Sequence, residues 1–249
     1  MLADDTLVDE RPAPTAIVTG GAGGIGKAVC EALARDGFIV VVADRDELGA
    51  RAVADACGGF AVGVDVADEA SVVAAFGRAH DVLGRLDALV TAAGIAAVAP
   101  FMDHSAASFR AIGDVNVLGT YLCIREAAKR MTSGGRICTI ASIAGLLAVP
   151  SAVAYAASKA AVISLTRSAA SWLGRDGIAV NGVAPGFVMT PMVDAALSEA
   201  DRERVAARTI VQRLADPDEI AEAIAWLVSQ RASYVHGSIL GIDGGLSLA

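Results

Sequence analysis

Two side chains that lie four residues apart could together move a proton. Tyr155 and Lys159 form the pattern Y-x-x-x-K within a helix predicted at residues 151–173, so both project from one helical face. A free phenol, with a pKa of about 10, is a poor base at neutral pH. A neighbouring ammonium group and the positively charged ring of a bound cofactor would both favour the phenolate, and a pKa of Tyr155 lowered by about two to three pH units would make it a usable base. Tyr155 could then take a proton from an alcohol or give one to a ketone.

Ser142 and Asn116 are two further polar residues that could serve this chemistry. Ser142 follows a strand predicted at residues 136–141, at the end where open α/β sheets bind ligands. Its hydroxyl could hold a substrate oxygen beside Tyr155, or it could cap the next segment. Asn116 stands in the helical sequence VNVLG. It could mark a water-binding kink that feeds a proton relay to Lys159, or it could be a buried structural amide.

The glycine-rich segment TGGAGGIG, at residues 19–26, could bind a dinucleotide. It follows a predicted strand and opens a predicted helix, and it fits both G-x-G-x-x-G and T-G-x-x-x-G-x-G. Glycine permits the unusual backbone angles of such a turn, and its lack of a Cβ lets the backbone approach a pyrophosphate. The first N–H groups of the following helix would then face the phosphates.

Acidic residues at the ends of the next two predicted strands indicate which dinucleotide is bound. Asp44 stands about twenty residues after the glycine-rich turn, where a carboxylate accepts hydrogen bonds from the adenosine ribose and repels the 2′-phosphate of NADP. This favours NAD, although Arg45 follows directly and could hold a phosphate. Asp65 could accept the adenine amino group while Val66 packs on the ring, or Asp65 could cap a helix that begins near Asp68.

These residues must be positioned by alternating strands and helices. Apolar runs predict strands at residues 16–19, 38–43, 60–64, 88–91, 136–141, 179–184 and 238–242. Helical patterns separate them, the first at residues 26–36. Strands that are apolar on both faces belong in a parallel sheet covered by helices. We therefore expect an α/β fold of the Rossmann type, with a doubly wound, parallel, seven-stranded sheet in three layers. Residues 14–249 would form one domain, residues 1–13 a flexible tail, and the charged residues 186–213 a small helical lid.

Composition narrows the classes of partner. The chain has 249 residues, 55% of them hydrophobic, and a formal net charge of −8. An acidic surface repels nucleic acid and anionic lipid, and the tail lacks the apolar core of a signal peptide. We therefore expect a cytoplasmic protein with no nucleic-acid or membrane partner. The three scattered histidines predict no metal site, and the four cysteines, none of them in a C-x-x-C pair, predict free thiols.

Taken together, these motifs resemble the short-chain dehydrogenase/reductase family, in its single-domain branch. The matching pieces run nearly end to end: TGGAGGIG at 19–26, Asp44, Asp65, AAG at 92–94, Asn116, Ser142, YAASK at 155–159, PG at 185–186 and DGG at 243–245. The resemblance implies an oxidoreductase that interconverts a secondary alcohol and a ketone with NAD. It also implies the catalytic tetrad Asn116, Ser142, Tyr155 and Lys159.

The resemblance further implies how the cofactor is bound. Lys159 would grip the nicotinamide ribose, and Val188 and Thr190 would contact the carboxamide. The residues expected to bind the cofactor are Gly20, Gly23, Gly24, Ile25, Gly26, Asp44, Arg45, Asp65, Val66, Ala92, Ala93, Gly94, Tyr155, Lys159, Pro185, Gly186, Val188 and Thr190. A homotetramer is implied as well, with dimers formed through the helices that hold Asn116 and Tyr155.

One segment departs from the family pattern. The family usually has N-N-A-G after the fourth strand, where this chain has T-A-A-G at residues 91–94. The asparagine that Ala92 replaces normally braces the neighbouring strands. Its loss puts local rigidity in question rather than the chemistry, because Ala93 and Gly94 can still approach the cofactor through their backbone.

The small-molecule substrate is expected to be a hydrophobic or ring-bearing alcohol. Apolar side chains would line its site: Ile95, Ile143, Leu146, Leu147, Phe187, Val188, Met189 and Met192. One alternative is an NADPH-dependent 3-oxoacyl thioester reductase of the same family, which Asp44 and the lack of a basic residue at positions 21–25 disfavour. Another is a catalytically silent NAD-binding redox sensor, which would have no need to keep Ser142, Tyr155 and Lys159 together.

Overall fold

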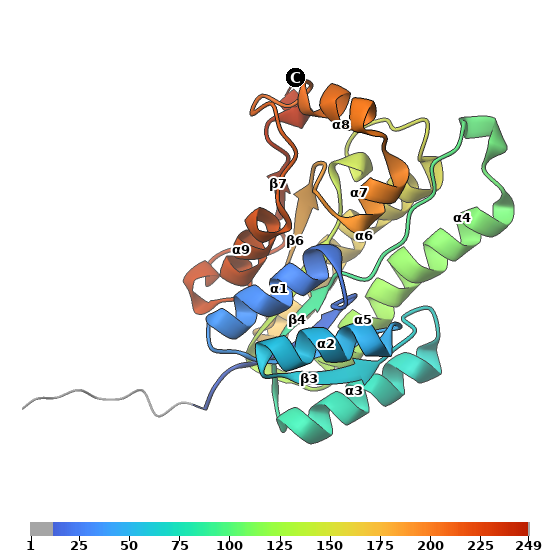
Figure 1. Ribbon diagram of the computed structural model, residues 1–249. Coiled ribbons are helices and arrows are strands. Elements are labelled where there is room, and N and C mark those ends of the chain that lie inside the picture. Colours follow the sequence, from blue (N-terminus) through green and yellow to red (C-terminus); the bar gives the residue numbers. More distant parts are fainter. Residues whose placement is uncertain (1–11, 249) are drawn as a thin grey trace, which may run out of the picture.

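A parallel sheet of seven strands forms the centre of the molecule (Figure 1). The computed structural model describes residues 12–248, so the tail predicted at residues 1–13 lies mostly outside it. The strands are β1 (Thr15–Thr19), β2 (Ile39–Asp44), β3 (Phe60–Gly63), β4 (Leu86–Thr91), β5 (Met131–Ile140), β6 (Ala179–Pro185) and β7 (Ile239–Ile242). Their order in the sheet is β3-β2-β1-β4-β5-β6-β7, and every pairing is parallel. The Rossmann-type fold predicted from the sequence is confirmed.

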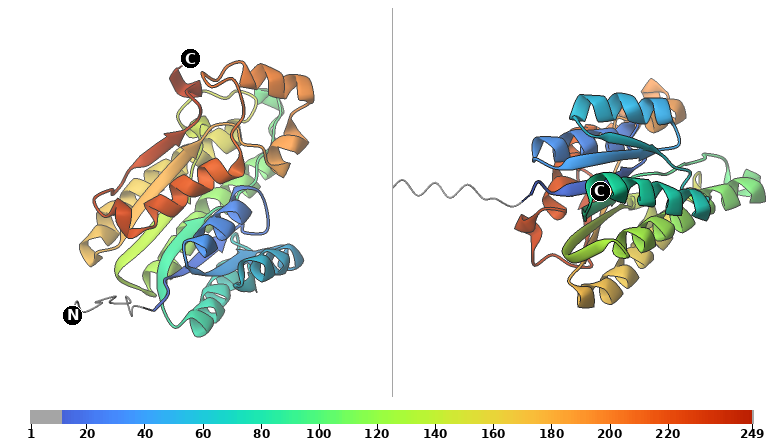
Figure 2. Two further views of the ribbon diagram at one scale, coloured as in Figure 1. Left: turned by 60° about the vertical axis from the view of Figure 1, so that its left-hand side comes forward. Right: turned by 90° about the horizontal axis from the view of Figure 1, so that it is seen from below.

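Helices cover both faces of the sheet, which gives the three layers visible in Figures 1 and 2. One layer contains α1 (Gly24–Arg35), α2 (Glu47–Cys57) and α9 (Pro217–Leu227), and the other contains α3 (Glu69–Leu83), α5 (Gly119–Ala128) and α6 (Val153–Leu173). Ala16 and Val18 of β1 pack in the first core, whereas Ile17 packs in the second. Successive strand residues point to opposite faces, so both must be apolar when both faces are buried. This is why the strands could be recognised as apolar runs.

The direction of winding reverses between β1 and β4. From β1 the chain builds outward to β2 and β3, and then returns to place β4 on the other side of β1. At such a reversal the loops at the carboxyl ends of the two strands diverge and leave a crevice for a ligand. The glycine-rich turn after β1 and the T-A-A-G segment at the end of β4 therefore lie next to each other.

The helix that carries Asn116 is interrupted. α4 (Ala106–Gly113) and α5 are joined by a π-helical turn at Asp114–Leu118. Gly119 follows this turn and packs against the loop after β3, since a Cβ on Gly119 would lie 2.8 Å from Cγ2 of Val66. Such turns are single-residue insertions into an α-helix and occur frequently at functional sites. The kink that the sequence offered as one interpretation of Asn116 is therefore a π-helical turn.

The charged segment after β6 folds into two short helices, α7 (Pro191–Ala196) and α8 (Glu199–Ala206). Thr190 and Ser198 cap their N-termini through side-chain oxygens, and Pro191 occupies the first turn of α7. Both helices lie at the upper end of the molecule in Figure 1. Neither contains a buried residue, so both helices lie on the surface of the protein.

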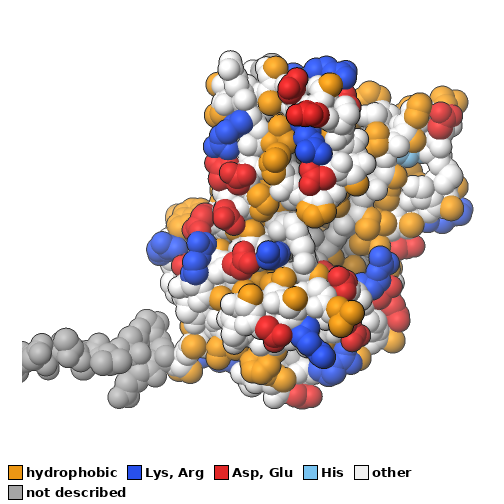
Figure 3. Space-filling view, in the orientation of Figure 1, with side chains coloured by type: hydrophobic (Ala, Val, Ile, Leu, Met, Phe, Trp, Pro, Cys, Tyr) orange, Lys and Arg blue, Asp and Glu red, His pale blue; other side chains and the backbone are white. Residues whose placement is uncertain are grey.

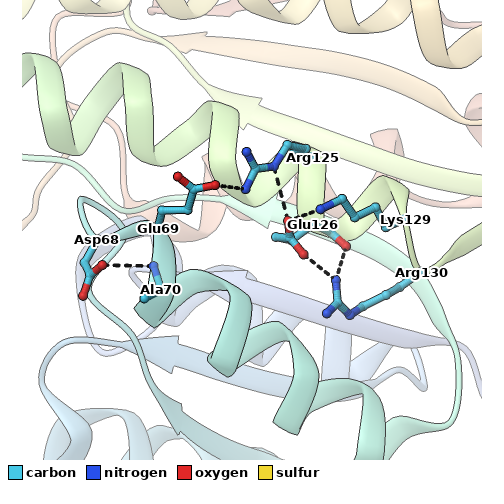
Figure 4. A network of polar contacts seen from close by, with 7 residues as sticks. All are labelled: Asp68, Glu69, Ala70, Arg125, Glu126, Lys129 and Arg130. Carbon is cyan, nitrogen blue, oxygen red and sulfur yellow. Dashed lines mark hydrogen bonds and ion pairs between the residues drawn. The ribbon is translucent and has the colours of Figure 1, made fainter.

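A network of charged side chains around the buried carboxylate of Glu126 links α5 to α3 (Figure 4). Glu126 accepts hydrogen bonds from Lys129 at 2.6 Å, Arg130 at 2.8 Å and Arg125 at 3.2 Å. Arg125 also reaches Glu69, the first residue of α3, at 2.6 Å. Burial alone would raise the pKa of Glu126, but the bonds from Lys129 and Arg130 outweigh it and bring the pKa to about 2. Glu126 therefore stays ionised and holds its cations at neutral pH.

Candidate active site

A cavity of about 380 Å³ lies at the carboxyl ends of the strands. The surface is hollowed in the middle of the face seen in Figure 3, below α7 and α8. The cavity is lined by Gly20, Gly23, Gly24, Ile25, Gly26, Asp44, Arg45, Val64, Asp65, Val66, Ala92, Ala93, Gly94, Ile95, Val115, Ile140, Tyr155, Lys159, Thr190, Pro191 and Met192. Segments from eight separate parts of the chain therefore meet around one space.

Most of the residues expected to bind a cofactor lie on this wall. Pro185, Gly186 and Val188 do not: Val188 is buried in the core, and a Cβ on Gly186 would lie 2.9 Å from the Cα of Asp243. Val64, Val115, Ile140 and Pro191 also line the cavity, although the sequence did not single them out. Each directly precedes or follows a residue that was predicted to bind or react, apart from Ile140, which ends β5 two residues before Ser142.

The apolar residues predicted around the substrate divide into several groups. Ile95 and Met192 line the main cavity. Leu146, Leu147 and Met189 are exposed, whereas Ile143 and Val188 are buried. Phe187 lines a separate, smaller cavity of about 130 Å³ between α9 and the chain end. The apolar wall beside Tyr155 is thus formed by fewer side chains than the sequence suggested.

The glycine-rich turn has the shape that a pyrophosphate requires. Gly20 and Gly24 have φ of 70° and 55°, in the left-handed region that favours glycine. A Cβ on Gly26 would lie within 2.1 Å of the carbonyl oxygen of Gly20, so the helix could not approach the turn with any side chain there. Gly23 precedes α1 without a side-chain cap, and the first turn of α1 holds no acidic residue. Its free N–H groups are therefore available to an anion in the cavity.

Two acidic residues line the cavity beyond this turn. The carboxylate of Asp44, at the end of β2, accepts hydrogen bonds from the N–H groups of Ala22 and Asp46, both at 3.0 Å. These bonds fix the carboxylate against the glycine-rich turn. Asp65 accepts a bond from the N–H of Ala67 at 3.0 Å. Asp68, and not Asp65, caps α3, so the helix-cap interpretation of Asp65 is wrong.

Burial places the phenol of Tyr155 in an unfavourable environment for ionisation. Burial raises its pKa, and a hydrogen bond with Ser142 lowers it by a smaller amount. The pKa of Tyr155 in the protein alone is therefore raised, and the lowering expected from Lys159 together with a bound nicotinamide stays a prediction. Removal of the phenol from water is the stronger effect, because a phenolate loses its hydration when it is buried.

Lys159 is held beside Tyr155 but is engaged elsewhere. Its ammonium lies 5.6 Å from the centre of the Tyr155 ring and donates a hydrogen bond to the carbonyl of Ile140 at 2.7 Å. Burial lowers its pKa to about 8. Ser142 accepts a bond from the N–H of Ala144 at 3.1 Å, so its side chain is oriented by its own loop. Ser142, Tyr155 and Lys159 thus come together in space, as their types and spacing predicted.

The side chain of Asn116 is fully buried and makes three hydrogen bonds. Its carbonyl oxygen accepts from the N–H of Ile95, and its amide nitrogen donates to the carbonyl of Ile95 and to the hydroxyl of Ser158, all at 2.9 Å. These bonds use both N–H groups and the carbonyl oxygen of the amide. The observed contacts match the structural role that the sequence offered for Asn116.

The cavity fits the nicotinamide dinucleotide that the motifs imply. The glycine-rich turn would hold the pyrophosphate, Asp44 the adenosine ribose, and Lys159 the ribose at the other end. Gly94 adds no side chain at this end of the cavity, where a Cβ would lie 3.6 Å from the ammonium of Lys159. Within residues 12–248 there is no group of three or more His, Cys, Asp or Glu side chains suited to a metal ion. None of the described helices is both long and apolar enough to cross a membrane.

Comparison with known proteins points to one family. A family model described as enoyl-(acyl carrier protein) reductase matches residues 20–247. The chain is 44% identical over 238 residues to cis-4-hydroxycyclohexanecarboxylate dehydrogenase of Sinomonas cyclohexanicum, which covers 92% of this chain and 95% of that protein. It is 39% identical over 241 residues to 2,5-dichloro-2,5-cyclohexadiene-1,4-diol dehydrogenase of Sphingobium indicum, which covers 94% and 96%.

Solved structures agree. A dehydrogenase/reductase from Sinorhizobium meliloti superposes with a TM-score of 0.87 at 37% identity and covers 94% of both chains. The fold, the motifs and these relatives all extend over nearly the whole chain. The protein therefore belongs to the short-chain dehydrogenase/reductase family and is an oxidoreductase that uses a nicotinamide cofactor.

Proposed function

We propose that this protein is an NAD-dependent dehydrogenase that interconverts a ring-bearing secondary alcohol and the corresponding ketone. The observation that carries the proposal is that the two ends of its cavity differ in chemistry. At one end the carboxylate of Asp44 is fixed by two backbone N–H groups. At the other end Tyr155 and Lys159 stand beside the apolar side chains of Ile95 and Met192.

The choice of NAD rests on Asp44. A fixed carboxylate at the end of β2 can accept two ribose hydroxyls, and it repels a phosphate on the same ribose. The positions between Gly20 and Gly26 hold no basic residue that could offset this repulsion. Arg45 also lines the cavity and is the one neighbour that could bind a phosphate. The same argument disfavours an NADPH-dependent 3-oxoacyl thioester reductase.

The residues around Tyr155 divide the work of the reaction. When bound, the nicotinamide ring would accept a hydride from the alcohol carbon. Ser142 would hold the alcohol oxygen, and the phenolic oxygen of Tyr155 would take its proton. Lys159 would bind the ribose and favour the phenolate through its charge. A silent redox sensor would gain nothing from this arrangement.

The names of two relatives support a ring-bearing substrate. Both the Sinomonas and the Sphingobium enzymes are named for alcohols on a six-membered carbon ring. The flat apolar surface that such a ring presents would suit Ile95, Pro191 and Met192. The four free cysteines support the cytoplasm, a reducing compartment, as the site of action.

A screen of cyclic and open-chain secondary alcohols with NAD⁺ and NADP⁺, followed at the absorbance of the reduced nicotinamide, tests the proposal. We expect turnover of six-membered ring alcohols, with a higher kcat/KM for NAD⁺ than for NADP⁺. Replacing Asp44→Ala should reduce this preference. Faster turnover with NADP⁺ by the unaltered protein would contradict the assignment of Asp44, and turnover of acyl thioesters alone would favour the reductase.

A further inference from the structure

Ser158 stands in the Y-x-x-x-K segment but has no role in the reaction described so far. Its side chain is only 4% exposed. Its hydroxyl donates a hydrogen bond to the carbonyl of Tyr155 at 2.7 Å and accepts one from the amide nitrogen of Asn116 at 2.9 Å. Ser158 therefore connects the first turns of α6 to the π-helical turn, at a site sealed from water.

The bond from Asn116 matters because that amide holds a loop. Asn116 clamps Ile95 by both its N–H and its carbonyl, each at 2.9 Å. On either side of Ile95 the loop is held by backbone hydrogen bonds. The N–H of Ala92 donates to the carbonyl of Thr19, and the N–H of Ala99 donates to the carbonyl of Ser151. Residues 92–100 have no regular secondary structure. The position of Ile95 on the cavity wall thus depends on how the Asn116 amide is oriented.

The orientation of that amide is fixed at its second N–H by Ser158. If the hydroxyl were absent, this N–H would be buried without an acceptor, which is costly. The amide would gain by turning toward another partner, and any turn would release Ile95. Gly94 leaves room beside this amide, because it has no side chain and even a Cβ there would lie 3.4 Å from the carbonyl oxygen of Asn116.

We propose that Ser158 is a positioning residue, which fixes the Asn116 amide and thereby sets the place of Ile95 at the alcohol end of the cavity. Ser158 ties this wall to the helix turn that carries Tyr155, so the substrate wall and the catalytic phenol move together. The effect on substrate rests on the proposed function, whereas the effect on the loop does not.

Hydrogen exchange of the protein without ligands tests the loop directly. Ser158→Ala keeps the helix and removes only the hydroxyl. We expect exchange in a peptide spanning residues 93–98 to quicken by about tenfold, because a buried N–H loses its acceptor and the clamp loosens. Ser168→Ala is the matched control, since Ser168 is exposed on the same helix. It should leave that peptide unchanged.

A double-mutant comparison separates positioning from general loosening. If Ser158 acts through Asn116, Ser158→Ala should add less than about twofold to the exchange rate once Asn116→Ala is present. Additive effects, or unchanged exchange in Ser158→Ala, would overturn the proposal.

Kinetics then test the consequence for the alcohol. In Ser158→Ala the KM for a ring alcohol should rise by about fivefold, while the dissociation constant for NADH and the pH profile of kcat stay as they were. Ser158→Thr retains the hydroxyl and should restore both the exchange rate and the KM. An unchanged KM beside a loosened loop would show that Ile95 does not contact the substrate. If no alcohol is oxidised by any variant or by the unaltered protein, the proposed function fails and the exchange result still decides the role of Ser158.

Discussion

At the scale of single residues, burial disfavours the charged form of both Tyr155 and Lys159. Burial raises the pKa of the phenol and lowers that of the ammonium. In the protein alone the pair therefore favours neutral tyrosine. We expect the positive charge of a bound oxidised nicotinamide to favour the phenolate, so that ionisation of Tyr155 is coupled to binding of the cofactor.

Removing the phenolic hydroxyl tests whether Tyr155 transfers the proton. Tyr155→Phe keeps the ring and should leave NADH affinity nearly unchanged, while alcohol oxidation slows by at least about a hundredfold. Fluorescence titration of NADH beside steady-state rates separates the two effects. Ser142→Ala should also slow turnover without changing NADH affinity. Near-normal turnover by Tyr155→Phe would rule out the mechanism.

The buried ammonium of Lys159 should cost stability. Folding lowers its pKa from 10.5 to about 8, so between these values the unfolded chain holds a proton that the folded protein lacks. The free energy of unfolding therefore rises with pH across this window. Below pH 8 the full cost applies, about 3 kcal/mol at about 1.36 kcal/mol per pH unit.

Lys159→Met removes this cost and should make the protein more stable but inactive. We expect its unfolding temperature at pH 7 to exceed that of the unaltered protein by about 5 °C, the lost bond to Ile140 offsetting part of the gain. The difference should shrink toward pH 10, as the lysine of the unaltered protein becomes neutral. Calorimetry at the two pH values measures both. Equal unfolding temperatures throughout would mean that the charge of Lys159 carries no penalty.

At the scale of elements, α7 and α8 lie on the surface beside the cavity. They contain no buried residue, yet Thr190, Pro191 and Met192 reach the cavity. Elements with few buried contacts open at low free energy. We predict that they close over bound ligands, so that amide exchange at residues 186–213 slows when NAD⁺ and an alcohol are added. Exchange in α3, none of whose residues lines the cavity, serves as the internal control. Unchanged exchange at 186–213 during confirmed turnover would count against a lid.

The elements were predictable to the extent that burial shaped their sequences. Strands buried on both faces appear as apolar runs, and all seven lie where the sequence predicts them. β5 begins at Met131, five residues before the predicted start, because the sequence TSGG at 132–135 has the composition of a turn yet continues the strand. A regular run of apolar residues marks a strand only where both faces are covered.

The site was predictable in its residue types and not in its contacts. Glycines, Asp44, Ser142 and Y-x-x-x-K carry local signals, because each chemistry needs a particular residue at a particular spacing. Asn116 hydrogen-bonds to Ile95, 21 residues before it, and to Ser158, 42 residues after it. Nothing in the local sequence VNVLG indicates such distant partners. The burial that raises the pKa of Tyr155 in the protein alone was not predicted for a related reason, since the depth of burial depends on how distant segments pack.

At the scale of the whole molecule, exposed apolar side chains gather on the helices that carry Asn116 and Tyr155. Phe109 on α4, Tyr121 on α5 and Trp172 on α6 are between 45% and 72% exposed. Exposed large apolar side chains on helices that pack together favour association. We predict a homotetramer that sedimentation velocity will detect at micromolar concentration.

A charge placed on these helices should disrupt that assembly. Tyr121→Glu would bury a carboxylate between subunits and should shift the protein toward smaller species. Val82→Glu, on the exposed side of α3, is the matched control and should leave the assembly intact. A monomer in the unaltered protein would refute the prediction.

The π-helical turn has a consequence for how this chain can vary in length. From Ala106 to Ala128 the backbone forms one continuous helical rod, with a turn of π-helix at Asp114–Leu118 in its middle. An α-helix advances by about 100° per residue, so the loss of one residue from that turn would rotate α4 by about this angle relative to α5. The segment would then be a regular α-helix, and Asn116 would face away from Ile95. A substitution along the rod changes one side chain. A single insertion or deletion near Asn116 rotates all the residues on one side of it relative to those on the other side. The length of this segment is therefore as much a part of the site as its residues are.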